Sequence, residues 1–191
     1  MLSKNRIEAF SDGVIAIIIT IMVFDLKIPE LAEHFTDAEL HKALWGIVPK
    51  LAAYTLSFIV VAIMWLNHHS LFDKIPHSTS KLVWYNAFLL FGMSLIPLPT
   101  AFLASHPFLP EASMLYGLVL GFTALGFTFL RAYAQGKAKL ISYNQLVQRS
   151  NIIGTSLYLL SAPLAFVSVY LSFAIFIGIP LWYFLPDKFQ K

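Results

Sequence analysis

Two carboxylates stand at the beginning of a strongly apolar segment. Glu8 and Asp12 precede the residues from Val14 to Phe24, in which Thr20 is the single polar side chain. A helix needs about 20 residues to cross the roughly 30 Å core of a bilayer, and residues 7–28 reach that length only if both carboxylates belong to the helix. An ionisable group at that depth costs about 2–3 kcal/mol or more unless it is paired or hydrated. We therefore interpret this segment as a membrane helix whose polar end has a functional or structural role.

The Asp12 carboxylate needs a hydrogen-bonding partner at its own depth in the membrane. If the second apolar segment crosses the bilayer in the opposite direction, its last residues lie beside Asp12, and His68 is among them. Charge-assisted hydrogen bonds from such side chains would satisfy the carboxylate. We expect a structural clamp here and keep a proton relay between Asp12 and His68 as the alternative. The cluster expected at this level comprises Arg6, Ser11, Asp12, Asn67 and His68, with Trp65 beside it.

Other chemistry has little support in the sequence. His68 and His69 are adjacent, so on a helix they point about 100° apart and do not chelate one metal ion as an i, i+4 pair does. The spacing of His69, Asp73 and His77 is helical, but Pro76 interrupts any helix there. The sequence has no phosphate-binding glycine loop, nucleophile elbow or paired-carboxylate site. We therefore expect no enzymatic activity, metal site or cofactor.

Composition places the chain in the membrane. Of its 191 residues, 58% are hydrophobic and 12% are charged, whereas about a quarter of the residues in soluble domains are charged. The expected fold class is an all-α integral membrane protein that forms one domain over residues 1–191. Pro97 and Pro99 should kink or end the third span, and Gly117 and Gly121 allow close packing either within the chain or between subunits. Six spans are expected, at about 7–28, 43–67, 81–103, 113–133, 152–166 and 168–185, the last two being the shortest.

The distribution of basic residues predicts the orientation. Lysine and arginine gather in cytoplasmic loops, and with an inner N-terminus ten basic residues lie inside and three lie outside. Both termini are then cytoplasmic, in the plasma membrane, and most of the acids face outward. The basic stretch from Arg131 to Arg149 is expected to meet anionic membrane lipids and not nucleic acid. The inner residues are Lys4, Arg6, Lys74, Lys81, Arg131, Lys137, Lys139, Arg149, Lys188 and Lys191, and the outer ones are Lys27, Lys42 and Lys50.

The first helix has two different sides. Relative to Ile17, the side chains of Thr20, Ile21 and Phe24 lie at about −60°, +40° and −20°, and so form one apolar stripe with a single hydroxyl. Gly13 and Phe10 continue this stripe inward, whereas Ser11 and Asp12 point away from it. The pattern suits a helix that is buried on all sides. It equally suits a helix whose stripe lines a narrow passage while neighbouring helices hold its carboxylate.

The arrangement Arg6-x-x-x-Phe10-Ser11-Asp12, followed by an isoleucine-rich helix, resembles the signature of the transmembrane protein 175 family of potassium channels. The six-helix plan and Trp65-x-x-His68 are similar to the same family. The resemblance covers essentially the whole chain and implies the single-repeat prokaryotic form, which assembles as a homotetramer. It also implies a leak channel that is selective for K⁺, or at least permeable to K⁺, and that works without a TVGYG filter. This sequence contains no TVGYG motif. Phe10 and Trp65 then belong with the motif residues.

The resemblance also implies a pore lined by the first helix. The position of the family's constriction is Ile17, further apolar pore positions are Ile21 and Phe24, and Thr20 supplies a ring of hydroxyl groups. Rings of apolar side chains gate by excluding water, and Asp25 would concentrate cations at the outer mouth. The competing interpretations are a small proton-coupled secondary transporter, which typically contains internal repeats and broken helices, and a membrane scaffold that transports nothing.

Overall fold

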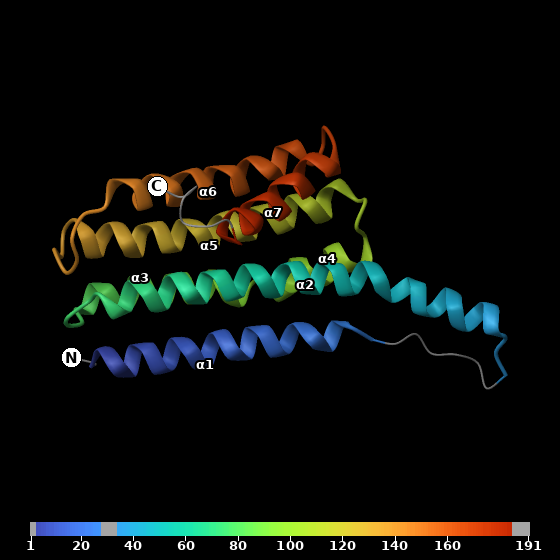
Figure 1. Cartoon of the computed structure of the whole chain (residues 1–191), viewed down its shortest axis with the longest axis horizontal. Coiled ribbons are helices and arrows are strands. Elements are labelled where there is room, and N and C mark those ends of the chain that lie inside the picture. The colour runs from blue at the N-terminus through green and yellow to red at the C-terminus, as the bar shows by residue number, and fades with distance from the viewer. Residues whose placement is uncertain (1–2, 28–33, 185–191) are drawn as a thin grey trace.

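The computed structural model describes residues 3–27 and 34–184, and within these ranges it contains helices and no strands. Figure 1 shows the helices running side by side along the long axis of the molecule, with α1 at one edge and α6 at the other. Because α1 packs against α2, α3 and α4, it has neighbours on one side only. The elements are α1 (Lys4–Met22), the 3₁₀ turn η1 (Val23–Asp25), α2 (Asp37–Asp73), α3 (Ser80–Ser94), α4 (Pro97–Ser105), α5 (Pro110–Gln135), α6 (Gln145–Leu164) and α7 (Val169–Phe184).

The third expected span is interrupted where its prolines begin. Helix α3 ends at Ser94, and α4 starts at Pro97 after two residues of helical turn. Proline lacks the N–H of an intrahelical bond and is tolerated in the first turn of a helix. The two pieces still form one continuous rod, Ser80–Ser105. This rod, together with Lys4–Asp25, Asp37–Asp73 and Pro110–Gln135, is long and apolar enough to cross a membrane.

Helix α2 begins earlier than the sequence suggested. Residues 37–42, which precede the expected span 43–67, form its first turns, and Pro49 lies well inside the helix. The cause is a capping box: the Thr36 side chain accepts from Glu39 N at 3.3 Å, and the Glu39 carboxylate accepts from Thr36 N at 2.8 Å. With 37 residues, α2 is about 55 Å long, so it exceeds the bilayer core and its first turns project beyond the bundle (Figure 1).

The division between the last two helices falls where it was expected. Helix α6 ends at Leu164 and α7 starts at Val169. Helix α6 has 20 residues, more than the expected range 152–166, but it is still shorter than the first span, Lys4–Asp25, which has 22 residues. The extra residues come from its N-terminus, where the Asn144 side chain accepts from Val147 N at 3.2 Å and caps the helix at Gln145.

Close packing of α5 holds the second half of the bundle together. A Cβ atom on Gly121 would lie 2.5 Å from Leu159 Cδ2, and one on Gly117 would collide with Ser161 Oγ. Both partners are on α6, so this pair of glycines serves a contact within the chain. On another side of α5, a Cβ on Gly126 would lie 3.1 Å from the Leu89 backbone of α3. Helix α5 is thus the centre of the fold.

Candidate pore helix and polar cluster

One face of α1 leaves large apolar side chains uncovered within the subunit. Phe10, Ile17, Ile21 and Phe24 are 64%, 57%, 47% and 73% exposed, respectively. These residues recur at the spacing of a single helical stripe, which also carries Gly13 and Thr20, and we call this set the α1 stripe. Contiguous exposed apolar side chains mark a surface that meets lipid or another protein chain.

The opposite face of α1 is packed. Its buried residues follow the same helical spacing and contact α2, α3 and α4. Ile17 is therefore not part of the core of one subunit, and of the two interpretations of the helix, the one that buries it on all sides is excluded for the subunit. The buried residues are Ile7, Ser11, Ile15, Ile18 and Met22.

Thr20 is the hydroxyl of the α1 stripe, and its proton is already used. Its Oγ1 donates to Ala16 O at 3.1 Å and to Ile17 O at 3.0 Å in the preceding turn. Because the hydroxyl oxygen has two lone pairs, it still has acceptor capacity on an exposed position. The group can thus present an oxygen, and not a donor proton, to whatever faces the stripe.

The expected cluster around Asp12 is divided in the structure. Asp12 lies on an exposed surface, where its Oδ1 accepts from Trp65 Nε1 at 2.9 Å. Asn67 instead donates to the Tyr183 hydroxyl at 3.2 Å, and His68 points into the core. Arg6 is exposed and is not among the side chains that hold Asp12. The reason is helix geometry: successive residues point about 100° apart, so neighbours on one helix cannot share one partner.

The buried part of the motif forms a second group. Asn86 Nδ2 donates to Ser11 Oγ at 2.9 Å, and Asn86 Oδ1 accepts from His68 Nε2 at 2.7 Å. All three side chains are at most 2% exposed, and they join α1, α2 and α3. The sequence analysis missed Asn86, although an amide inside the apolar third span, at the depth of His68, signals a buried polar partner.

A second buried network lies behind the outer half of α1. Ser57 Oγ is 2.8 Å from Thr100 Oγ1 and 2.9 Å from the Tyr116 hydroxyl. The Thr100 hydroxyl lies 4.0 Å from Met22 Sδ on the packed face of α1. These contacts connect α1 with α2, α4 and α5. Asp25, expected at the outer mouth, is exposed in η1 at the end of α1 opposite to Asp12.

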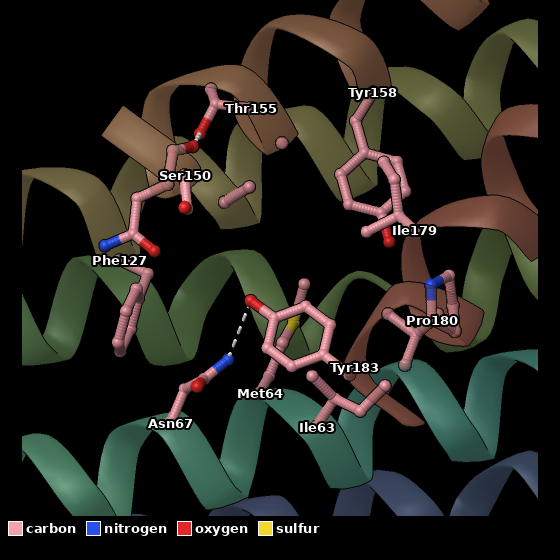
Figure 2. A pocket seen from close by; sticks show the side chains of 14 residues that line it. Ile63, Met64, Asn67, Phe127, Ser150, Thr155, Tyr158, Ile179, Pro180 and Tyr183 are labelled. Atoms are coloured by element: carbon pink, nitrogen blue, oxygen red, sulfur yellow. Dashed lines mark hydrogen bonds between the residues drawn. The ribbon is translucent and has the colours of Figure 1, made fainter. Parts of the chain in front are cut away.

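A pocket of about 70 Å³ lies on the other side of α2, between α2, α5, α6 and α7. Figure 2 shows the Asn67 side chain and the Tyr183 hydroxyl meeting across it, with Tyr158 reaching in from α6. Apart from Asn67 and Tyr183, the wall is apolar on α2 and α7, where Ile63 and Ile179 lie, and it contains polar side chains on α6. The α1 stripe and this pocket are thus separate features.

Comparison with known proteins places this arrangement in a family. Residues 6–97 match the family described as endosomal/lysosomal potassium channel TMEM175. A potassium channel from Chryseobacterium sp. (strain P1-3) is 34% identical, with 98% of this chain and 95% of that protein covered. The crystal structure of a lysosomal potassium-selective channel TMEM175 homologue from Chamaesiphon minutus superposes with a TM-score of 0.81 at 30% identity, covering 94% of this chain and 95% of that one.

The human relative is similar over a smaller part. It is named endosomal/lysosomal proton channel TMEM175 and is 37% identical over 51% of this chain, which corresponds to 20% of the human protein. The two bacterial relatives span nearly the whole chain, and the crystal structure of the Chamaesiphon minutus homologue shares its helical arrangement. The chain is therefore an all-α integral membrane protein that belongs to the TMEM175 family of potassium channels.

Proposed function

We propose that this chain is the subunit of a potassium channel in which four copies surround a pore lined by α1. The observation that carries the proposal is the α1 stripe, because Ile17 and Phe24 stay 57% and 73% exposed although they occupy the helix that begins with the family motif. Helix α1 also lies at the edge of the subunit, where a neighbouring copy can reach it (Figure 1). The potassium channels that are similar over nearly the whole chain support the same function.

In such an assembly the stripe supplies the constriction. Four copies of Ile17 form an apolar ring, with rings of Ile21 and Phe24 further out, and a narrow apolar ring opposes ion passage by excluding water. Between Ile17 and Ile21, four Thr20 hydroxyls turn oxygen atoms inward, because their protons are held by the helix backbone. Oxygen atoms replace part of the hydration shell of a dehydrating cation. Asp25 attracts cations to the outer entrance.

The motif residues support one rotation of α1. Ser11 is held by Asn86 on the packed side, and Asp12 is held by Trp65 beside it. With the α1 stripe on the opposite side, we propose that these two anchors act as a structural clamp and not as a proton relay. Phe10 and Arg6 lie at the inner end of the same helix, with both termini on the cytoplasmic side of the plasma membrane.

The experiment is K⁺ flux through purified protein in liposomes. Replacing Ile17→Asn should hydrate the constriction and raise the flux at least about tenfold, a change of roughly 1.4 kcal/mol in the barrier. The matched control is Ile153→Asn on α6, because Ile153 is 58% exposed, as Ile17 is, but lies on a different helix. An unchanged flux in Ile17→Asn, or an equal rise in both variants, would remove Ile17 from the pore.

Protons are the second candidate for the permeant ion, since the animal relatives are named proton channels. Potassium, sodium and proton fluxes should therefore be measured on the same liposomes. A K⁺ flux that persists when the pH is equal on both sides supports the potassium channel. A K⁺ flux that requires an opposing proton gradient would instead support the proton-coupled transporter.

A further inference from the structure

Arg131, near the C-terminal end of α5, carries a buried donor, its Nε–H group, that has no partner among the described residues. Residues 112–184 contain no Asp or Glu. A partly buried guanidinium whose Nε–H is unpaired would therefore be stabilised by an anion from outside these residues, because a buried donor is stable only when it is hydrogen-bonded.

The position of Arg131 suits the surface of the bilayer. Arg131 lies 21 residues after Pro110, the first residue of α5, and this separation corresponds to about 32 Å along the helix axis. The hydrocarbon core is about 30 Å thick, so the guanidinium lies at the level of the lipid head groups. Arg131 lies on the same side of the membrane as the N-terminus, which is the side with the excess of lysine and arginine residues. Exposed Lys137, Lys139 and Arg149 lie in the same part of the chain.

Arg131 also continues the wall of the pocket in Figure 2. Ala124 and Phe127 line that pocket from α5, and Arg131 lies seven and four residues further, on the same helical face. From α6 the wall includes Asn151, whose Nδ2 is a second buried donor without a partner among the described residues. The hydroxyl oxygens of Thr128 on α5 and Thr155 on α6 lie 3.1 Å apart. Arg131 lies about one turn after Thr128, and Asn151 lies about one turn before Thr155. Because the two helices are antiparallel, Arg131 and Asn151 are therefore at the same level.

The pocket has mainly apolar side chains from α2 and α7, with Asn67 and Tyr183 as polar exceptions, and polar side chains from α6. Its apolar wall comes from Val60, Ile63 and Met64 on α2 and from Ile179 and Pro180 on α7. The polar wall comes from α6 and leads to the two unpaired donors. A molecule that matches both the apolar walls and the unpaired donors has a hydrocarbon chain attached to an anionic group that contains oxygen atoms. Basic pockets between membrane helices on the cytoplasmic side bind such head groups.

We propose that this groove binds an anionic phospholipid, with its phosphate on Arg131 and Asn151 and the beginning of an acyl chain between α2 and α7. The phosphate accepts from the guanidinium and from the Asn151 amide, and so satisfies both unpaired donors through charge-assisted bonds. The site is distant from the α1 stripe, and its occupancy is measured without ion flux. Its failure would therefore leave the proposed channel function untouched.

The test is lipid retention by the purified full-length channel. Delipidated protein is offered equal amounts of phosphatidylglycerol and phosphatidylcholine in detergent, and bound lipid per subunit is measured by mass spectrometry after washing. The wild-type protein should retain phosphatidylglycerol in clear excess. Arg131→Gln should reduce that excess about fivefold or more. The matched control is Arg149→Gln, which removes an exposed arginine of α6 and should reduce the excess much less than Arg131→Gln does.

Two further variants keep the test decisive if Arg131→Gln does not fold. Gly154→Leu adds bulk to the pocket at a glycine whose Cβ would meet nothing within 4 Å, so it should displace the lipid while the fold is retained. Asp187→Asn removes the one carboxylate after Glu111 and should not change retention. A rise in retention would make Asp187 the counter-ion of Arg131 and overturn the proposal.

Three other results would also overturn it. The first is a wild-type protein that retains no excess of phosphatidylglycerol, and the second is an equal loss in Arg131→Gln and Arg149→Gln, which would reveal only a general effect of surface charge. The third comes from inorganic phosphate. If millimolar phosphate displaces phosphatidylglycerol completely, the site binds a free anion and the acyl chain contributes nothing.

Discussion

Helices α1 and α5 are similarly apolar, yet the fold treats them in opposite ways. In the most apolar 18 residues of each, 28% of the α1 residues and 56% of the α5 residues are buried. Helix α5 carries glycines at its contacts with α3 and α6, whereas Gly13 on α1 would accept a Cβ without meeting any atom within 4 Å. Helix α5 is thus committed to its own subunit, and α1 keeps one face for something outside it.

This difference shows how stability and function are separated in the bundle. Membrane helices associate through close van der Waals packing and not through hydrophobic exclusion from water, so small residues indicate where the subunit is held together. A helix without such contacts on one face adds little to the subunit but can form a surface shared between copies. Substitutions on α5 should therefore lower stability, and those on the α1 stripe should alter conduction.

The largest effect on stability is expected at Gly117. Gly117→Ala drives a methyl group into Ser161 Oγ and within 3.1 Å of Tyr158 O. Overpacking of this kind costs about 1–3 kcal/mol, which corresponds to a fall of about 3–10 °C in the thermal midpoint for a chain of this size. The measurement is the midpoint of heat-induced loss of monodisperse protein in detergent.

The control for that substitution is Gly178→Ala on α7, where nothing lies within 4 Å of the added Cβ. Alanine is the better helix former by up to about 1 kcal/mol, so the midpoint should stay or rise slightly. Gly13→Ala should behave in the same way on the α1 side. If Gly13→Ala lowered the midpoint as much as Gly117→Ala, the contrast between the two helices would be lost.

The sequence alone predicted some of these regions better than others. Hydropathy and proline positions predicted the helices because the membrane imposes a length on every span. Helical periodicity predicted the α1 stripe because Ile17, Thr20 and Phe24 share a face whatever surrounds them. The role of Gly117 and Gly121 stayed open, since small residues permit a contact without naming its partner. Only the position of α6 decided it.

The polar clamp was predicted less well. One cluster was expected where the structure has two, because Asp12 and Ser11 turn to different sides, and Arg6 and Asn67 belong to neither. Asn86 was missed, since its pairing with His68 depends on how α2 and α3 are packed and no local pattern states that. The start of α2 was missed for a different reason. Thr36-x-x-Glu39 is a readable capping signal, but the second span was expected to begin only at residue 43.

An intermediate effect is expected when the two halves of the clamp are compared. Asn86→Ala leaves the buried Ser11 and His68 side chains without their partner, at a cost of about 2 kcal/mol. Asp12→Ala removes a bond on the exposed surface and should cost less than about 1 kcal/mol within the subunit. Thermal midpoints rank the two, and size-exclusion chromatography reports whether Asp12→Ala also weakens assembly.

Measuring ion flux through the Asp12→Ala variant gives a second test of what Asp12 does. If Asp12 only anchors α1, the variant should lose assembled tetramer while the tetramer that remains keeps its preference for K⁺. A normal yield of tetramer with altered ion preference would show that the carboxylate acts on the ions and would contradict the clamp. Likewise, a larger loss of stability in Asp12→Ala than in Asn86→Ala would reverse the assignment of the buried group as the main anchor.

The smallest effect on stability is expected at the first turns of α2, which project beyond the rest of the bundle. The hydrogen bonds from Thr36 lower the pKa of Glu39, which lies outside the expected membrane span. A lowered pKa in the folded state stabilises the capping box above the ordinary pKa of the carboxyl, and this stabilisation is lost as the pH falls through the folded value. Hydrogen exchange of the first-turn amides, such as Leu40 N, should therefore show less protection, beyond the intrinsic pH effect, below about pH 4.

Two variants separate the cap from the charge. Thr36→Ala removes the side chain that accepts from Glu39 N and should raise exchange in the first turn about fivefold at neutral pH. Glu39→Gln keeps an acceptor that does not titrate, so the protection should become independent of pH in the acid range. Neither variant should change the thermal midpoint of the bundle, because both side chains are exposed in the subunit. A fall comparable with that of Gly117→Ala would show that the projecting turns are packed against another copy of the chain.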